Sequence, residues 1–303
     1  NISDHSPNDL RAIIDEAKAR KLKRQNLNKS APDEDKPFEG KSIAMIFEKP
    51  STRTRMSFDI AVKQLGGTSI ILNPDGIHYG KGDETLKDTA KVLTEYVDIV
   101  MLRTSSHKNL EEFGKHLDIP IINGLSDIGH PCQIMSDILT YEESNGAIEG
   151  KTISWLGDGN NNMSNSLIEA AGKFKFNLRI ACPKKYSPNK KILSWAKKNK
   201  VKLIVTTKPD DAVKGSDCVM TDKWVSMNDK VNKKAKKKFL KPFQVNKKLM
   251  SKANSDSIFM HCLPVGRGEE VTDEVIDGKQ SVVWRQALNR VHVQKSIIKW
   301  CLD

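Results

Sequence analysis

Short apolar runs rich in β-branched residues alternate with amphipathic stretches along most of the chain, and this alternation constrains the fold most strongly. Helix-like segments separate the runs, such as 51–65, in which Phe58, Ala61 and Leu65 recur at helical spacing. This rhythm indicates an α/β protein with parallel sheets. The candidate strands are 42–47, 68–73, 98–103, 120–125, 152–157, 178–182, 202–206, 217–221 and 257–262.

The strands fall into two series, with a helix-like stretch from Gln133 to Ser144 between them. A chain of 303 residues with 38% hydrophobic composition is long enough to bury two cores. We therefore expect two domains, each a parallel β-sheet flanked by helices. The segment 288–300 is expected to form a closing helix.

Composition excludes several classes of protein. No apolar run approaches the roughly 18 residues that span a bilayer, and the first 30 residues lack the apolar core of a signal peptide. The five cysteines are widely spaced and form no CxxC, which favours reduced thiols over disulfides or zinc ligands. We expect a soluble, cytoplasmic protein that binds no membrane.

The formal net charge of +12 is compatible with a nucleic-acid binder, with attraction of anionic substrates, or with a bias toward lysine. No nucleic-acid-binding motif is present, so the last two interpretations are favoured. The lysine run 230–241 is interpreted as a solvated helix face. A basic nucleic-acid-binding protein remains the rival from another class.

Polar residues crowd the start of the helix expected after the first strand, in the sequence Ser51-Thr52-Arg53-Thr54-Arg55. Free backbone N–H groups at a helix N-terminus, two hydroxyls and the guanidinium groups of Arg53 and Arg55 would hold a phosphate dianion. For an isolated S-T-R, a simple N-cap would be the better interpretation. Five polar residues after a buried strand favour an anion site.

Further polar residues follow other strands. Arg103 ends the strand 98–103, at an edge where open parallel sheets bind ligands. In the loop after 120–125, His130 could donate to a polarised carbonyl oxygen, and Gln133 could hold an amide. The segment 157–162 reads G-D-G-N-N-N, and because Asn162 replaces the third glycine, the dinucleotide fingerprint is not met.

Two candidate sites for an amino group lie in the second half, after the strands that end at 221 and 262. Asp222 is a natural partner for an ammonium group, and Cys262, if partly thiolate, could share that role. A buried, inert thiol is the alternative for Cys262.

The motifs S-T-R-T-R at 51–55, H-P-C-Q at 130–133, D-x-W-x-S-M at 222–227 and H-C-L-P at 261–264 occur in this order. In this set the chain resembles the ornithine carbamoyltransferase family over essentially its whole length. The related aspartate carbamoyltransferases have H-P-T-Q and H-P-L-P at the later sites. Cys132 and Cys262 therefore favour ornithine as the acceptor.

The resemblance implies a carbamoyl-phosphate-binding domain at 1–132, an ornithine-binding domain at 133–287 and a C-terminal helix at 288–303 that returns to the first domain. It implies an ornithine site of four residues, Asn162, Asp222, Ser226 and Met227, with Cys262 near the attacking amine. Around carbamoyl phosphate it implies Ser51, Thr52, Arg53, Thr54, His78, Arg103, His130, Gln133, Cys262, Leu263 and Arg290.

Arg53, Arg103, His130 and Cys262 are the implied catalytic residues, and His78 would reach a neighbouring subunit's site in a homotrimer. The implied reaction transfers a carbamoyl group from carbamoyl phosphate to ornithine without a metal or organic cofactor. It serves arginine biosynthesis or, as the alternative, arginine catabolism. The nearest rival acceptors are putrescine and an acylated ornithine, against which Ser226 and Met227 argue.

Overall fold

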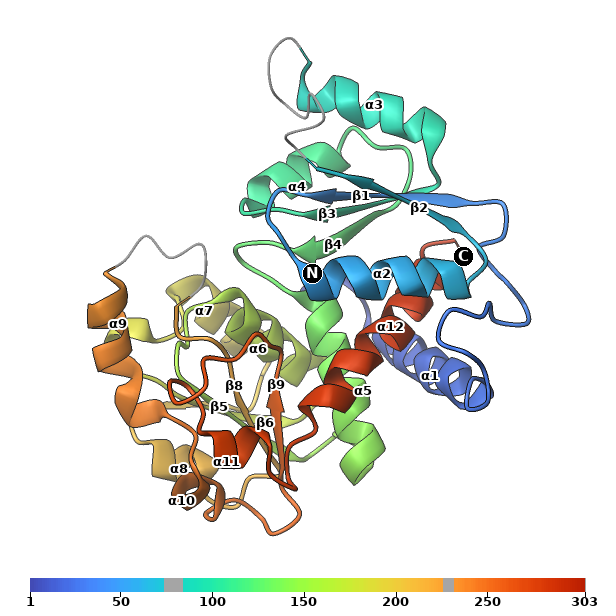
Figure 1. Cartoon of the computed structure of the whole chain (residues 1–303). Helices are drawn as coiled ribbons and strands as arrows, with labels where there is room; N and C mark the ends of the chain where they lie inside the picture. The colour runs from blue at the N-terminus through green and yellow to red at the C-terminus, as the bar shows by residue number, and fades with distance from the viewer. Residues whose placement is uncertain (74–83, 226–231, 303) are drawn as a thin grey trace. The chain divides into compact units, whose positions relative to one another are not determined.

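The computed structural model describes residues 1–73, 84–225 and 232–302, and it divides the chain into two compact units. Unit 1 comprises Asn1, 8–136 and 288–303, and unit 2 comprises 2–7 and 137–287. Figure 1 shows that each unit is built around its own sheet, with helices against it. Among the described helices, none is both long and apolar enough to cross a membrane.

Unit 1 contains a four-stranded parallel sheet in the order β2-β1-β3-β4. The central strand β1 pairs with β2 from Ser42 to Ile46 and with β3 from Ile43 to Phe47. Since all strands run the same way, their carboxyl ends meet at one edge, the edge that carries Arg103. The strands are β1 (Ser42–Phe47), β2 (Thr68–Leu72), β3 (Ile99–Arg103) and β4 (Ile121–Leu125).

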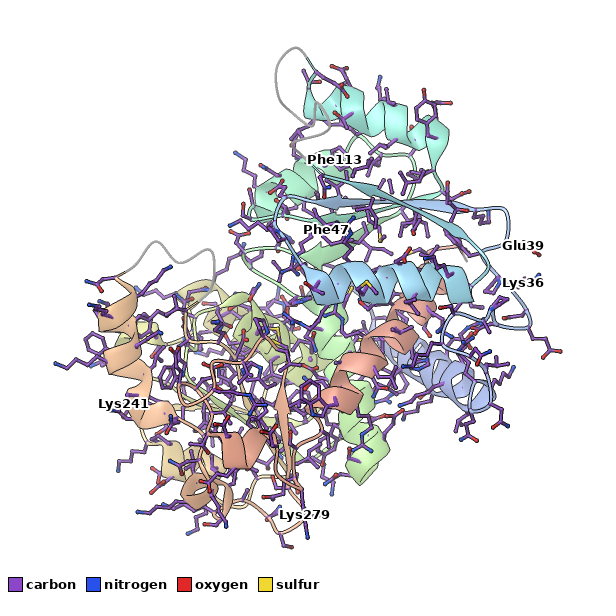
Figure 2. The ribbon with its side chains drawn as sticks, in the orientation of Figure 1. Lys36, Glu39, Phe47, Phe113, Lys241 and Lys279 are labelled. Atoms are coloured by element: carbon purple, nitrogen blue, oxygen red, sulfur yellow. The ribbon has the colours of Figure 1, made fainter. Side chains whose placement is uncertain are left out.

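Alternate residues of this sheet supply two separate cores, as the period of a strand requires. One core joins Met45 and Phe47 to α2 and α12, and the other joins Ile46 to α3 and to Phe113 of α4. Figure 2 labels Phe47 and Phe113, which belong to the two opposite faces. The helices are α1 (Pro7–Lys23), α2 (Thr52–Gln64), α3 (Leu86–Tyr96) and α4 (His107–Gly114), together with parts of α5 (Pro131–Asn145) and α12 (Val283–Trp300), whose residues within 137–287 belong to unit 2.

The C-terminal helix α12 packs on the helices of unit 1, which confirms the predicted fold class. Val291 and Ile298 enter the same core as Phe58 of α2. A buried ionic cluster adds to this contact: the Lys295 ammonium group lies 2.9 Å from the Asp33 carboxylate, which also accepts hydrogen bonds from Arg20 and Arg24 of the α1 region. Burial lowers the pKa of Lys295 to about 8, although Asp33 opposes that shift.

Unit 2 contains a five-stranded parallel sheet in the order β7-β6-β5-β8-β9. Leu156 of β5 packs with α8, α10 and α11, while Ile153 and Trp155, which point to the other face, are also buried. The strands are β5 (Thr152–Leu156), β6 (Asn177–Ala181), β7 (Leu203–Thr206), β8 (Cys218–Thr221) and β9 (Ile258–His261). The helices include α6 (Asn162–Phe174), α7 (Lys190–Lys198), α8 (Pro209–Val213), α9 (Lys233–Leu240), α10 (Lys247–Met250) and α11 (Asp273–Ile276).

Every predicted strand lies within about one residue of an observed one, because these buried runs of β-branched residues are flanked by turn-forming residues. The closing helix begins at Val283 rather than 288. In its first turns the polar Gln286 is buried and the apolar Trp284 is exposed, so the sequence there lacks the apolar periodicity of a helix.

The lysine run is not a uniformly solvated face. Lys236 is 5% exposed, so the prediction is wrong for this residue. Its neighbours Lys233, Lys234 and Lys238 are exposed as expected.

Candidate active site

The N-terminus of α2 forms a polar loop at the carboxyl end of β1. The Ser51 side chain caps the helix by accepting a hydrogen bond from the Thr54 N–H at 3.4 Å. The N–H groups of Thr52 and Arg53 have no acceptor within the helix, because the first turn lacks preceding carbonyls. The cap and an anion site are therefore compatible, and the helix end favours a negative charge.

Two arginines distant in sequence converge on Thr54, whose side chain is buried. Arg103, at the end of β3, lies 3.3 Å from Thr54 Oγ1, and Arg290 of α12 lies 3.4 Å from the same oxygen. Arg290 also donates to Gln133 Oε1 at 2.6 Å. Strand order and helix packing thus bring together four of the predicted donor-site residues.

His130 is buried beside these arginines. Burial and the positive charges of Arg290, Arg103 and Arg53 lower its pKa well below the usual value for histidine. The imidazole is therefore neutral at pH 7, and one ring nitrogen can donate a hydrogen bond while the other accepts. A neutral donor can polarise a carbonyl oxygen without adding charge to a cationic pocket.

Cys132, two residues later, is an inert thiol. It is 2% exposed, and burial raises its pKa to about 11. Its Sγ lies 3.5 Å from the Asn123 carbonyl, to which the thiol donates. The cysteine of H-P-C-Q therefore contributes packing in unit 1.

The two arginines of the S-T-R-T-R loop have different environments. Arg53 is half-buried, and its charge acts on His130. Arg55 is exposed, and its charge acts on Asp59 instead. Only Arg53 is thus associated with the cluster around Thr54.

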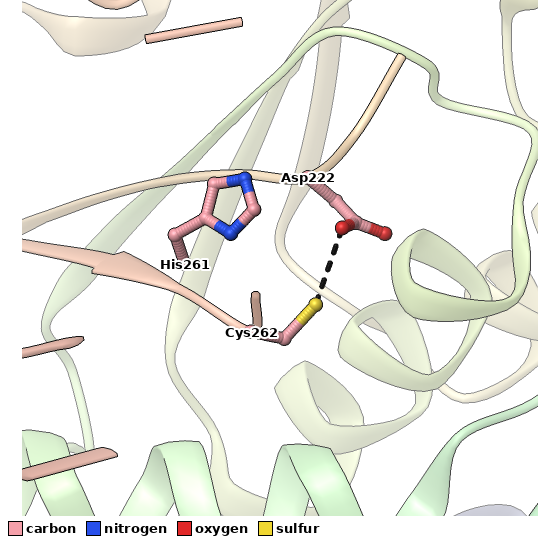
Figure 3. A group of neighbouring side chains, drawn as sticks. All are labelled: Asp222, His261 and Cys262. Atoms are coloured by element: carbon pink, nitrogen blue, oxygen red, sulfur yellow. Dashed lines mark hydrogen bonds between the residues drawn. The ribbon is translucent and has the colours of Figure 1, made fainter. Parts of the chain in front are cut away.

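In unit 2, the ends of β8 and β9 bring Asp222 and Cys262 together. The Cys262 thiol donates to Asp222 Oδ1 at 3.2 Å, as the dashed line in Figure 3 shows. Both residues are partly exposed, so a solvent-borne ligand can reach them. An acceptor carboxylate beside a polarisable sulfur suits an amino group.

The turn after Cys262 is held by His261, which is fully enclosed. The Leu263 N–H donates to His261 Nδ1 at 2.8 Å, and His261 Nε2 lies 3.2 Å from Glu270 Oε1. Because Nδ1 accepts, Nε2 must carry the proton that bonds Glu270. Leu263 has φ +57°, a left-handed conformation that costs roughly 1 kcal/mol or more outside glycine.

Asp222, His261 and Cys262 offer ligand atoms within 4.8 Å of one another, which raises the question of a metal. Both nitrogens of His261 already take part in hydrogen bonds to Leu263 and Glu270. Within the described part of the chain, this group therefore fits a hydrogen-bonded turn better than a metal site.

The segment 157–162 forms a tight turn into α6. Asn161 caps the helix through the Ser164 N–H, and Asn162 is its first residue. A side chain at Gly159 would lie 2.9 Å from the Tyr186 carbonyl, so this glycine serves close packing. The turn thus has a structural reason for its glycine that needs no dinucleotide.

Three predicted residues fall outside the described part of the chain, namely His78, Ser226 and Met227. Two buried polar residues of unit 2, Asp137 and Gln286, were not predicted from the sequence. Gln286 accepts from the His261 N–H at 2.9 Å and donates to Asp137 at 2.7 Å. Their spacing in the sequence could have indicated them. Gln286 lies one helical turn before Arg290, and Asp137 lies one helical turn after Gln133, so each shares a helix face with a predicted site residue.

Fold and side-chain geometry together define a protein with two parallel α/β units, one of which carries a cluster of arginines around a buried threonine. Family models agree with this description: "carbamoyl-P binding domain" of aspartate/ornithine carbamoyltransferase matches residues 1–143, and the corresponding "Asp/Orn binding domain" matches 149–301. The chain belongs to the aspartate/ornithine carbamoyltransferase family.

Curated relatives and solved structures point to one branch of the family. The ornithine carbamoyltransferase of Brucella ovis is 50% identical over 295 residues, which cover 97% of this chain and 92% of the relative. The structure of ornithine carbamoyltransferase from Pyrococcus furiosus superposes with a TM-score of 0.91 at 41% identity, covering 98% and 94% of the two chains. Anabolic ornithine carbamoyltransferase from Campylobacter jejuni has a TM-score of 0.89 at 36% identity, covering 99% and 97%.

Proposed function

We propose that this protein transfers the carbamoyl group of carbamoyl phosphate to the δ-amine of L-ornithine, giving L-citrulline and phosphate. The observation that carries the proposal is the convergence of Arg103 and Arg290 on Thr54, beside a neutral His130. Such a cluster suits a ligand that combines a phosphate with a carbonyl group. The branch of the family to which the relatives belong supports ornithine as the acceptor.

On the donor side, the helix start from Ser51 to Thr54 would bind the phosphate. Arg103, His130 and the Thr54 hydroxyl would stabilise the oxyanion that forms when the amine attacks the carbonyl carbon. Arg53 and Arg290 would offset the charge that grows on the departing phosphate. Gln133 would hold the carbamoyl NH₂ and, through its 2.6 Å hydrogen bond, orient Arg290.

On the acceptor side, Asp222 and Cys262 would orient the ornithine amine, and Asn162, Ser226 and Met227 would complete the ornithine site. Leu263 would complete the pocket around the carbamoyl group. Its backbone, which has a left-handed conformation, is held by the hydrogen bond to His261. Cys262 would also lie next to the carbamoyl group. The thiol would act by hydrogen bonding and not as a covalent nucleophile.

The reacting amine must be neutral, because an ammonium group has no lone pair. The δ-ammonium group of ornithine would therefore lose a proton before attack, and activity would rise with pH into the alkaline range. The proposed scheme requires no metal or organic cofactor.

We further propose residues 1–132 as the carbamoyl-phosphate domain, 133–287 as the ornithine domain and 288–303 as the returning helix. A homotrimer in which His78 reaches a neighbouring site, a cytoplasmic location and a role in arginine biosynthesis belong to the same proposal. The likeness to an anabolic enzyme of Campylobacter jejuni supports the biosynthetic direction.

The reaction is tested by incubating purified protein with carbamoyl phosphate and ornithine and measuring citrulline and phosphate together. We expect equal amounts of both products, and no carbamoylaspartate when aspartate replaces ornithine. Phosphate release without citrulline, or transfer to aspartate instead, would contradict the proposal.

A further inference from the structure

We propose that Lys236 and Asp158 form a positioning pair for the amino-acid substrate. The pair joins the turn that leads to Asn162 with the helix α9, which packs against Trp224 and Val225, shortly after Asp222. This inference rests on the proposed function, because it assigns the pair to the ornithine site. Neither residue was itself predicted to bind a substrate, although Asp158 lies in the segment 157–162 and Lys236 in the lysine run.

The pair is a buried ion pair inside unit 2. Lys236 Nζ lies 2.6 Å from Asp158 Oδ2, and both side chains are 6% exposed. The lysine ammonium group also lies 5.4 Å above the centre of the Tyr186 ring, where the aromatic face attracts a cation. Lys236 thus differs from its exposed neighbours in having a buried carboxylate partner.

The other carboxylate oxygen of Asp158 holds the turn. Asp158 Oδ1 accepts a hydrogen bond from the Asn160 N–H at 2.8 Å, and the Asp158 carbonyl accepts from Trp155 Nε1 at 2.9 Å. The Gly159 N–H donates to the Tyr186 carbonyl at 2.9 Å. The turn before Asn162 is therefore fixed through the same carboxylate that binds Lys236.

The helix α9 carries the lysine and packs against the residues that follow Asp222 along the chain. Leu240 at its end is buried in a cluster with Trp224 and Val225, which follow Asp222 along the chain, and with Tyr186. Asn232 caps the start of α9 by accepting from the Ala235 N–H at 3.2 Å. The helix is thus attached by its apolar side to the Asp222 segment and by Lys236 to the Asp158 turn.

The charges of Lys236 and Asp158 explain why the pair would fix the positions of the turn and of α9. Two desolvated charges gain little stability over apolar residues of the same size, but they accept only one geometry. Removing one of them leaves the other buried without its partner, which displaces the turn or α9. Either displacement would move Asn162 relative to Asp222, and these are the described residues proposed to bind ornithine.

The test compares four proteins with the wild type: Lys236→Met, Asp158→Asn, the double variant, and Lys237→Met as the matched control. Lys237 is the neighbouring lysine, with a side chain 42% exposed and paired to Glu269 at the surface. For both single variants we expect the KM for ornithine to rise about tenfold or more, because a broken buried pair would displace the turn or α9. The KM for carbamoyl phosphate should stay within about twofold, and Lys237→Met should match the wild type.

The double variant separates position from stability. It buries no unpaired charge, so its Tm should return close to that of the wild type, while its KM for ornithine should stay raised. A double variant with the wild-type KM for ornithine, or single variants in which both KM values move together, would overturn the inference. Absence of ornithine turnover in the wild type would instead refute the proposed function.

Discussion

Arg290 of α12 donates a 2.6 Å hydrogen bond to Gln133 of α5, and its second terminal nitrogen lies 3.4 Å from Thr54 Oγ1. The guanidinium plane is therefore oriented by protein groups before any phosphate arrives. Preorganised donors cost no reorganisation when charge develops on the ligand. With Arg103, four residues remote in sequence thus form one hydrogen-bonded cluster around the Thr54 hydroxyl, the site proposed to bind the phosphate.

Replacing Arg290 by lysine should lower kcat/KM for carbamoyl phosphate by about 10- to 100-fold, because an ammonium group cannot bind Gln133 and Thr54 with a planar fork. Gln133→Ala should cause a smaller loss, since the arginine keeps its charge and loses its orientation. Steady-state kinetics at saturating ornithine measure both. Equal activity of Arg290→Lys and the wild type would show that only the charge matters.

The S-T-R-T-R loop offers a matched pair of arginines. Arg53→Ala should reduce kcat by about 100- to 1,000-fold, which is typical of a lost contact to a developing charge. Arg55→Ala should stay within about threefold of the wild type, because Arg55 is exposed and its charge acts on Asp59. Activity of Arg53→Ala within tenfold of the wild type would contradict its assigned role.

Cys262→Ser should raise the KM for ornithine yet leave the alkaline rise of activity in place. The reason is that the rise of activity with pH would report loss of the δ-ammonium proton of ornithine and not ionisation of the thiol. The measurement is kcat/KM for ornithine from about pH 6 to 10. Loss of the rising limb in Cys262→Ser would identify the cysteine as the group that titrates.

Acid should destabilise unit 1 through its buried histidines. Burial and the nearby charge of Lys295 lower the pKa of His292 to about 3, so the folded state keeps this ring neutral. An unfolded chain protonates histidine below about pH 6.5. The unfolded state then binds more protons, and stability falls as pH decreases from about 6.5 toward 3.

For His292 alone, the loss amounts to about 2 kcal/mol at pH 5. Urea unfolding at pH 7 and pH 5 would measure it, with His292→Gln expected to show a shallower pH slope. His116→Gln, which changes a partly exposed histidine, serves as the control. An unchanged slope in His292→Gln would mean that this ring is protonated in the folded protein.

Elements whose residues repeat with one clear period were predictable from the sequence. The strand at 42–47 was predicted at its observed limits, because a buried parallel strand is a continuous apolar run between polar turns. The start of the helix at Ser51 could also be predicted, because N-cap positions have a strong residue preference. Arg103 could be placed at the carboxyl edge of the sheet, because the predicted parallel strand ends there.

The partners of buried polar groups could not be predicted. Asp158 and Lys236 are separated by much of unit 2 in sequence, and the lysine sits in a run that looks solvated. Likewise, the turn at Leu263 depends on Glu270 through His261, a contact set by the folded loop and not by spacing. Such pairs are specified by tertiary packing, so local patterns carry little information about them.

The acceptor is the central claim, and a panel of amines with carbamoyl phosphate tests it most directly. Initial rates with ornithine, putrescine and N-acetylornithine give kcat/KM for each. We predict saturable turnover with ornithine at least about 100-fold above the other two. Putrescine lacks the α-carboxylate and N-acetylornithine lacks the α-ammonium group, so either analogue would leave polar groups of an α-amino-acid site unpaired. Turnover of putrescine or N-acetylornithine that exceeds that of ornithine would contradict the assignment.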